Sequence, residues 1–209
     1  MTNFQKRIVT SLVVLPLSIF FIVKAGFYLT FFLVFILFAG IHELFSVFKK
    51  TQSIIFLSLI LILSLFSIYY LRENAELFLY LAIAVAISSD IGGYIFGKIF
   101  KWRKLTKISP KKTISGVFGS YFLSVVCLFV FFEILFIEPY SQPTFKFFLI
   151  TIIFSTVAQI GDLTISYFKR LEKIKDTGKI LPGHGGIFDR IDGLMFVVIL
   201  AFVINFLPT

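Results

Sequence analysis

The sequence predicts an all-α, polytopic membrane protein with about seven transmembrane helices and a cytoplasmic N-terminus. Of its 209 residues, 58% are hydrophobic and 30 are Phe, whereas only 15% are charged, well below the roughly 25% that is typical of soluble domains. A soluble domain of this length could not bury so much apolar surface in one core. The composition therefore excludes an ordinary water-soluble enzyme, and it equally excludes a disordered chain.

Seven apolar stretches supply the expected spans, because each is close to the roughly 20 residues that a membrane-crossing helix needs. The stretches are continuous rather than alternating, which argues against a transmembrane β-barrel. No small-residue cleavage site follows the first stretch, so we expect an uncleaved helix rather than a signal peptide. The seven stretches are 8–23, 27–48, 54–71, 77–100, 117–137, 145–160 and 191–207.

The net charge of +9 is distributed unevenly over the segments that connect these stretches. Seventeen of the 20 Lys and Arg residues lie before the first stretch, after the second, or within segments 98–112 and 169–190; only Lys24, Arg72 and Lys146 fall on the other side. Lys and Arg mark the cytoplasmic loops of membrane proteins, so we expect a cytoplasmic N-terminus. A phosphate-bearing substrate is the second explanation for the charge, and nucleic acid is not an expected partner.

The first half of the chain offers few candidates for chemistry. His42 and Glu43 lie at the cytoplasmic end of the second stretch, and we expect both to be solvated at the membrane interface. The connecting segments are too short for a second soluble domain. Residues 1–209 are therefore expected to form a single membrane domain, with residues 1–76 supplying N-terminal spans.

Asp90 lies well inside an apolar stretch. A carboxylate near the bilayer centre costs roughly 2.5–3.5 kcal/mol on insertion scales, so its presence predicts a polar cavity lined by protein, with a cation as partner. The role of Asp90 in such a cavity is left open. Nearby, Gly93 and Gly97 have the spacing of closely packed membrane helices, either within the chain or between two copies, so a homodimer is among the expected partners.

The basic segment 104–116, which contains Lys111 and Lys112, is consistent with two functions. It could be a cytoplasmic loop that binds anionic lipid headgroups. It could also be a phosphate cradle, in which Lys and hydroxyl donors stand beside a helix start near Gly116. Composition alone favours the loop that binds lipid headgroups.

A polar stripe marks the sixth apolar stretch. Gln159, Asp162, Ser166 and Lys169 recur at helical spacing, which places an amide, a carboxylate, a hydroxyl and an ammonium group on one helix face. The stripe begins at membrane depth, where polar side chains must face protein or water rather than lipid. A functional site on this face is therefore expected.

Two further carboxylates, Asp189 and Asp192, open the last apolar stretch. The place of Asp189 near a helix N-terminus explains its charge, because the helix dipole favours negative charge there. Asp192 lies further into an apolar helix, and the dipole does not explain it. Oxygen ligands suit Mg²⁺, which is commonly held by one or two carboxylates together with substrate phosphates. Carboxylates among basic residues at a membrane surface thus predict a metal-dependent phosphoryl or nucleotidyl transferase.

Three blocks of this sequence resemble the phosphatidate cytidylyltransferase (CDP-diacylglycerol synthase) family. The most specific combines Ser-Tyr-Phe-Lys-Arg at 166–170, Lys-Asp-Thr-Gly at 175–178 and Pro-Gly-His-Gly-Gly-Ile-Phe-Asp-Arg-Ile-Asp at 182–192. Segments 89–98 and 108–116 supply the other two blocks. Ile114-Ser115 stands where the family usually has Trp-Glu, and Ile165 where it often has Glu. The resemblance covers roughly residues 77–207, so 77–209 is expected to be the catalytic part.

The resemblance implies transfer of CMP from CTP to phosphatidate, which gives CDP-diacylglycerol and pyrophosphate in phospholipid biosynthesis. It implies Mg²⁺ as cofactor and CTP, phosphatidate and membrane lipid as partners. It also implies a place in the cytoplasmic membrane of a bacterium, with the active site facing the cytoplasm.

Carried over by position, the family's motif assigns three sets of residues. The catalytic set is Asp162, Ser166, Lys169, Asp189 and Asp192. The metal ligands within it are Asp162, Asp189 and Asp192. The phosphate-binding set is Lys111, Lys112, Lys169, Arg170, Lys175, His184, Gly185, Gly186 and Arg190.

Three alternatives remain at this point. A CTP-dependent polyprenol or phytol kinase shares part of the pattern but transfers the γ-phosphoryl group. An ion-coupled transporter could use Asp90, Asp162 and Asp192 as an ion path, although the sequence has no internal repeat and its basic residues gather on one side. The departure at Ile114-Ser115 also leaves room for an inactive paralogue.

Overall fold

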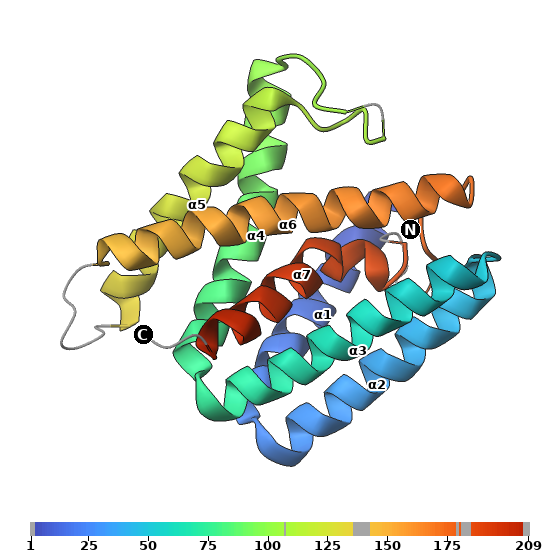
Figure 1. The fold of residues 1–209 in the computed structure, drawn as a ribbon, viewed down its shortest axis with the longest axis horizontal. Helices are drawn as coiled ribbons and strands as arrows, with labels where there is room; N and C mark the ends of the chain where they lie inside the picture. The colour runs from blue at the N-terminus through green and yellow to red at the C-terminus, as the bar shows by residue number, and fades with distance from the viewer. Residues whose placement is uncertain (1–2, 107, 136–142, 179, 181–184, 207–209) are drawn as a thin grey trace.

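The computed structural model describes every residue except 1–2, 107, 136–142, 179, 181–184 and 207–209. Within the described residues the chain forms seven helices and no strand (Figure 1), which confirms the all-α prediction. In order these are α1 (Asn3–Lys24), α2 (Gly26–Val47), α3 (Thr51–Asn74), α4 (Glu76–Phe100), α5 (Ile114–Leu135), α6 (Phe145–Leu171) and α7 (Phe188–Asn205).

Five of the described helices, α2 to α6, are long and apolar enough to cross a membrane. In α1 the apolar part found among the described residues is the shorter segment Leu12–Lys24. The first turn of α7 and the residue after it carry three charges, on Asp189, Arg190 and Asp192. The prediction of a membrane protein is confirmed, whereas seven spans and the orientation of the N-terminus stay predictions.

Two helices extend beyond the apolar stretches of the sequence, at the ends where polar residues begin. α6 continues through the polar stripe to Leu171, well beyond residue 160, and α7 begins at Phe188 rather than at residue 191. An apolar run marks the part of a helix without polar side chains, whereas the helical backbone hydrogen bonds continue through polar residues whose side chains face protein or water. The candidate residues of both segments therefore lie on rigid helices.

Glycines allow α4 and α5 to pack tightly against each other. A Cβ atom on Gly92 would collide with the backbone of Gly119, and one on Gly93 would lie 2.8 Å from the Oγ of Ser120. At Gly97 the nearest atom would be the Oγ1 of Thr113, 3.0 Å away. The Gly93–Gly97 spacing thus serves packing within the chain, and a homodimer stays an untested prediction.

Helix α7 is central to the bundle and joins its two hydrophobic clusters. Val197 packs with residues of α4, α5 and α6 in one cluster, while Phe188 and Met195 pack with residues of α2, α3 and α6 in the other. In Figure 1, α6 crosses the α4–α5 pair and α7 runs between α6 and α3. This arrangement holds the polar start of α7 against the polar stripe of α6.

The basic connecting segments gather at one end of the bundle. Glu172, just after α6, accepts hydrogen bonds from the backbone N–H groups of Lys49 and Lys50, at 3.3 and 3.0 Å. Arg170 donates to the carbonyl oxygen of Ile108 in the α4–α5 connection, at 3.3 Å. The three segments that the charge alternation places on one side thus lie together, while the side of the membrane that they face stays a prediction.

Candidate active site

A cavity of about 330 Å³ brings together the three segments that the sequence singled out. Its wall includes one carboxylate from α4, Asp90, one from α6, Asp162, and two from the start of α7, Asp189 and Asp192. Lys111 and Lys112 line it from the α4–α5 connection, together with Gln159 of the α6 stripe. The cavity therefore combines carboxylates and ammonium groups in one space between helices.

Lys112 points into this cavity and binds α6. Its Nζ lies 2.7 Å from Oδ2 of Asp162 and donates to the backbone carbonyl oxygen of Gln159 at 3.1 Å. The hydroxyl of Ser166 donates to Oδ1 of Asp162 at 3.3 Å. This geometry favours the reading of segment 104–116 as part of the site, because the Lys112 ammonium is directed at a carboxylate of the cavity.

The backbone of the α4–α5 connection holds Lys112 in this position. Lys104 and Thr113 form an antiparallel bridge, and the N–H of Leu105 donates to the carbonyl oxygen of Lys112 at 2.8 Å. The Oγ1 of Thr113 accepts the N–H of Gly116 at 3.1 Å. Such a side-chain acceptor satisfies an orphan donor in the first turn of a helix, so the connection and the start of α5 are fixed together.

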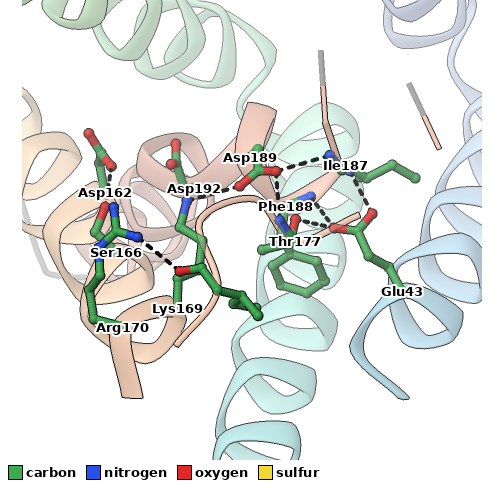
Figure 2. A network of polar contacts seen from close by, with 12 residues as sticks. Glu43, Asp162, Ser166, Lys169, Arg170, Thr177, Ile187, Phe188, Asp189 and Asp192 are labelled. Carbon is green, nitrogen blue, oxygen red and sulfur yellow. Dashed lines mark hydrogen bonds and ion pairs between the residues drawn. The ribbon is translucent and has the colours of Figure 1, made fainter. Parts of the chain in front are cut away.

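The second ion pair of the site is buried. The Nζ of Lys169 lies 2.9 Å from Oδ1 of Asp189, and the two side chains are 9% and 8% exposed. Oδ2 of Asp189 accepts the backbone N–H groups of Thr177 and Gly186, at 2.8 and 3.0 Å (Figure 2). Asp189 therefore joins α6, α7 and the segment between them at one point.

Asp90, Asp162 and Asp192 form the carboxylate-rich side of the cavity. Asp192 lies close enough to Asp162 and Asp90 for their negative charges to repel one another. The Asp192 side chain accepts the N–H of Gly193 at 2.9 Å, whereas no hydrogen bond from the described residues reaches the Asp90 carboxylate. Carboxylates held this close in a partly enclosed space favour a bound cation.

The donor chemistry of the cavity fits Mg²⁺. Its acidic ligands are all carboxylate oxygens, and Mg²⁺ is usually held by one or two carboxylates with phosphates and water completing the shell. Among the described residues no group of three or more His, Cys, Asp or Glu side chains is arranged to hold a metal ion. Asp162, Asp189 and Asp192 line one cavity but do not form a ready three-carboxylate cage, and their metal-binding role stays a prediction.

Several residues assigned to phosphate binding lie outside the cavity wall. Arg170 donates to the carbonyl oxygens of Ile108 and Ile174, so it braces two connecting segments. Lys175 is exposed. Their assignment rested on position in a motif, which does not specify the direction of a long side chain, and their role in binding phosphate stays a prediction.

The glycine turn before α7 is described only in part. His184 lies outside the described residues. The N–H of Gly186 already donates to Asp189, and Gly185 has a φ of +94°, a conformation that glycine adopts without strain. Arg190 follows Asp189 on α7 and does not line the cavity. A phosphate-binding role for these four residues stays a prediction.

The expectation of a solvated Glu43 is wrong. Glu43 is 1% exposed, and it accepts hydrogen bonds from the hydroxyl of Thr177 and from the backbone N–H groups of Ile187 and Phe188. Figure 2 shows the carboxylate directed at the segment that precedes α7. A Glu near the end of an apolar helix usually reaches water, and no local signal in the sequence reveals a partner more than a hundred residues away.

The fold and the site define a helical membrane protein with a carboxylate- and lysine-lined cavity near one end of its helices. A model of the "Cytidylyltransferase family" matches residues 51–207. The match covers most of the chain, and the chain belongs to this family.

Curated relatives carry a more specific name. The chain is 41% identical over 131 residues to the phosphatidate cytidylyltransferase of Staphylococcus haemolyticus, which is 62% of this chain and 49% of that protein. It is 40% identical over 131 residues to the one of Staphylococcus epidermidis and 39% identical over 131 residues to the one of Staphylococcus aureus, with the same shares covered. The chain spans about half the length of the curated relatives that it matches.

Proposed function

We propose that the protein transfers CMP from CTP to phosphatidate, forming CDP-diacylglycerol and pyrophosphate. One observation carries the proposal: Asp90, Asp162, Asp189 and Asp192 line a single cavity with Lys111 and Lys112, at the end of the bundle where the basic connecting segments gather. The names of the relatives support a cytidylyltransferase over a kinase or a transporter.

The proposed reaction joins two anions. An oxygen of the phosphatidate phosphate attacks the α-phosphorus of CTP, the bond from that phosphorus to the bridging oxygen breaks, and pyrophosphate leaves. A phosphate monoester is already anionic at neutral pH, so no strong general base is needed. Catalysis then rests on holding the two phosphates in line and on neutralising their charge.

The residues of the cavity divide between these two tasks. We assign Lys111 and Lys112, which line the cavity from the α4–α5 connection, to binding of phosphate oxygens. Lys169 reaches the cavity edge through Asp189. We assign Asp162 and Asp189, with Asp192 as a further ligand, to Mg²⁺, which would supply charge neutralisation on the phosphates when it is bound. Asp90 adds negative charge to the same wall.

The proposed location is the cytoplasmic membrane of a bacterium, with the cavity open to the cytoplasm. The basic segments at one end of the bundle support this orientation, because Lys49, Lys50 and the α4–α5 and α6–α7 connections meet there. The protein should then use CTP that is added to the medium around inside-out vesicles. It should not use CTP that is added to the medium around right-side-out vesicles.

The test is an assay of the full chain in detergent with phosphatidate, Mg²⁺ and CTP labelled in the cytidine. The proposal requires the label to enter the lipid and pyrophosphate to be released in equal amount. A second assay, with a polyprenol in place of phosphatidate, distinguishes the proposed reaction from that of a kinase. A kinase would release CDP and leave the lipid without cytidine. Cation flux without CTP in proteoliposomes is the corresponding test for a transporter.

A further inference from the structure

Glu43 is a buried carboxylate that the proposed reaction does not yet use. It lies on α2, before residue 51, where the match to the family model begins. Its oxygens accept three hydrogen bonds, from the hydroxyl of Thr177, the N–H of Ile187 at 2.7 Å and the N–H of Phe188 at 3.4 Å. Burying a carboxylate is costly unless it is well hydrogen-bonded, and here every donor comes from the segment that precedes and starts α7.

Two glycines make room for this carboxylate. A Cβ atom on Gly186 would collide with Oε1 of Glu43, and one on Gly178 would lie 3.1 Å from its Cγ and Cδ. Neither glycine has a positive φ, so backbone conformation does not require glycine at either position. The close approach of Glu43 explains both.

The same segment holds Asp189. The N–H of Thr177 donates to Oδ2 of Asp189 at 2.8 Å while its hydroxyl donates to Glu43. The N–H of Gly186 also donates to Asp189, at 3.0 Å. Figure 2 shows Thr177 between the two carboxylates, with Lys169 on the far side of Asp189. A shift of the Thr177 backbone would therefore displace the Asp189–Lys169 pair.

We infer that Glu43 is a positioning residue of the active site, which fixes the segment around Thr177 and Gly186 so that Asp189 and Lys169 are correctly placed at the cavity. The inference rests on the proposed function. It assigns α2, which the family model does not cover, a direct part in shaping the site. Glu43 acts through Thr177 and Asp189 and touches no substrate.

The test compares Glu43→Gln, Thr177→Val and the double variant, using the full chain. Loss of a partner in the outer shell of a site typically costs about 10–100-fold in activity, so each single variant should lower kcat by that factor. Because both changes act on the hydrogen bond between Thr177 and Glu43, their effects should not add, and the double variant should be about as slow as the slower single variant. Thr177→Ser keeps the hydroxyl and should recover most of the loss. Glu133→Gln, at an exposed site on α5, is the control.

Hydrogen exchange of the same proteins provides a readout that does not need turnover. Glu43→Gln should speed exchange at the amides of Thr177, Gly186, Ile187 and Phe188, while the amides of α4 and α5 stay as protected as in the wild type. Equal loosening of α4 and α5, or wild-type kcat together with wild-type exchange, would overturn the inference. A wild-type protein without turnover would refute the proposed function, and the exchange result would still decide whether Glu43 fixes the segment.

Discussion

The Nζ of Lys112 lies 2.7 Å from Oδ2 of Asp162, which joins the α4–α5 connection to the polar stripe of α6. Both groups line the cavity that also contains Asp90 and Asp192. The pair is about a quarter exposed, with side-chain exposures of 22% and 28%. This contact connects the basic residues of the chain with its intramembrane carboxylates.

Replacing Lys112 with Met should remove a positive charge that we propose binds a substrate phosphate. We expect kcat/KM for CTP to fall about 10²–10³-fold, as for loss of one preorganised donor to a developing anion. Lys146→Met removes an exposed Lys before the polar part of α6 and should leave turnover unchanged. Steady-state assays of both variants check this, and equal losses would show that Lys112 contributes only general charge.

Asp189→Asn should abolish CTP-dependent product while the protein remains folded and inserted. The variant keeps one acceptor oxygen but loses the charge that pairs with Lys169 and that we assign to metal binding. Glu73→Gln, at an exposed carboxylate near the end of α3 and outside the motif, is the control. Product formation, gel-filtration profile and helix content are measured together. Normal turnover of Asp189→Asn would show that the reaction does not need the Asp189 charge.

Gly186→Ala should destabilise the protein more than Gly178→Ala does. The added Cβ at 186 would collide with the Glu43 carboxylate, whereas the one at 178 meets it at 3.1 Å and needs only a small shift. Overpacking of this kind costs about 1–3 kcal/mol, and we expect Gly186→Ala to fall in that range. Thermal unfolding in detergent measures the order, and a reversed order would contradict the placement of Glu43.

We expect Glu172 to make stability depend on pH. Desolvation opposes its ionisation, but the N–H groups of Lys50 and Lys49 and the hydroxyl of Ser53 outweigh that effect, so the pKa of Glu172 lies below its usual value of 4.5. A lowered pKa adds stability above the unfolded-state value, and this stability is lost as pH falls through the folded-state value.

Glu172→Gln should therefore melt below the wild type near neutral pH, and the difference should shrink as the pH falls below 4.5. Thermal unfolding of both proteins across this range checks the sign. A difference that is constant with pH, or none at neutral pH, would show that the Glu172 contacts do not depend on its charge.

Sequence periodicity was most informative on α6. The spacing of Gln159, Asp162, Ser166 and Lys169 depends only on the helical repeat, and the structure places Gln159 and Asp162 at the cavity and Lys169 beside Asp189. The composition likewise predicted a helical membrane protein. Both signals are local, and for that reason a single sequence contains them.

Tertiary contacts were not predictable in the same way. The burial of Glu43 depends on the return of a segment that lies far along the chain. The direction of the Arg170 side chain depends on which carbonyl oxygens the folded connections present to it. The apolar stretch ended at residue 160, but the helical spacing of the polar residues up to Lys169 already predicted that the helix continues, and α6 ends at Leu171.

We propose that Asp162 and Asp192 serve a CMP transfer from CTP to phosphatidate. The most direct measurement follows cytidine-labelled CTP into lipid with the purified 209-residue chain, phosphatidate and Mg²⁺, for the wild type, Asp162→Asn and Asp192→Asn. We predict labelled CDP-diacylglycerol and equal pyrophosphate from the wild type, and a loss of both from the two folded variants. Labelled lipid formed at the wild-type rate by either variant, or none from the wild type, would contradict the claim.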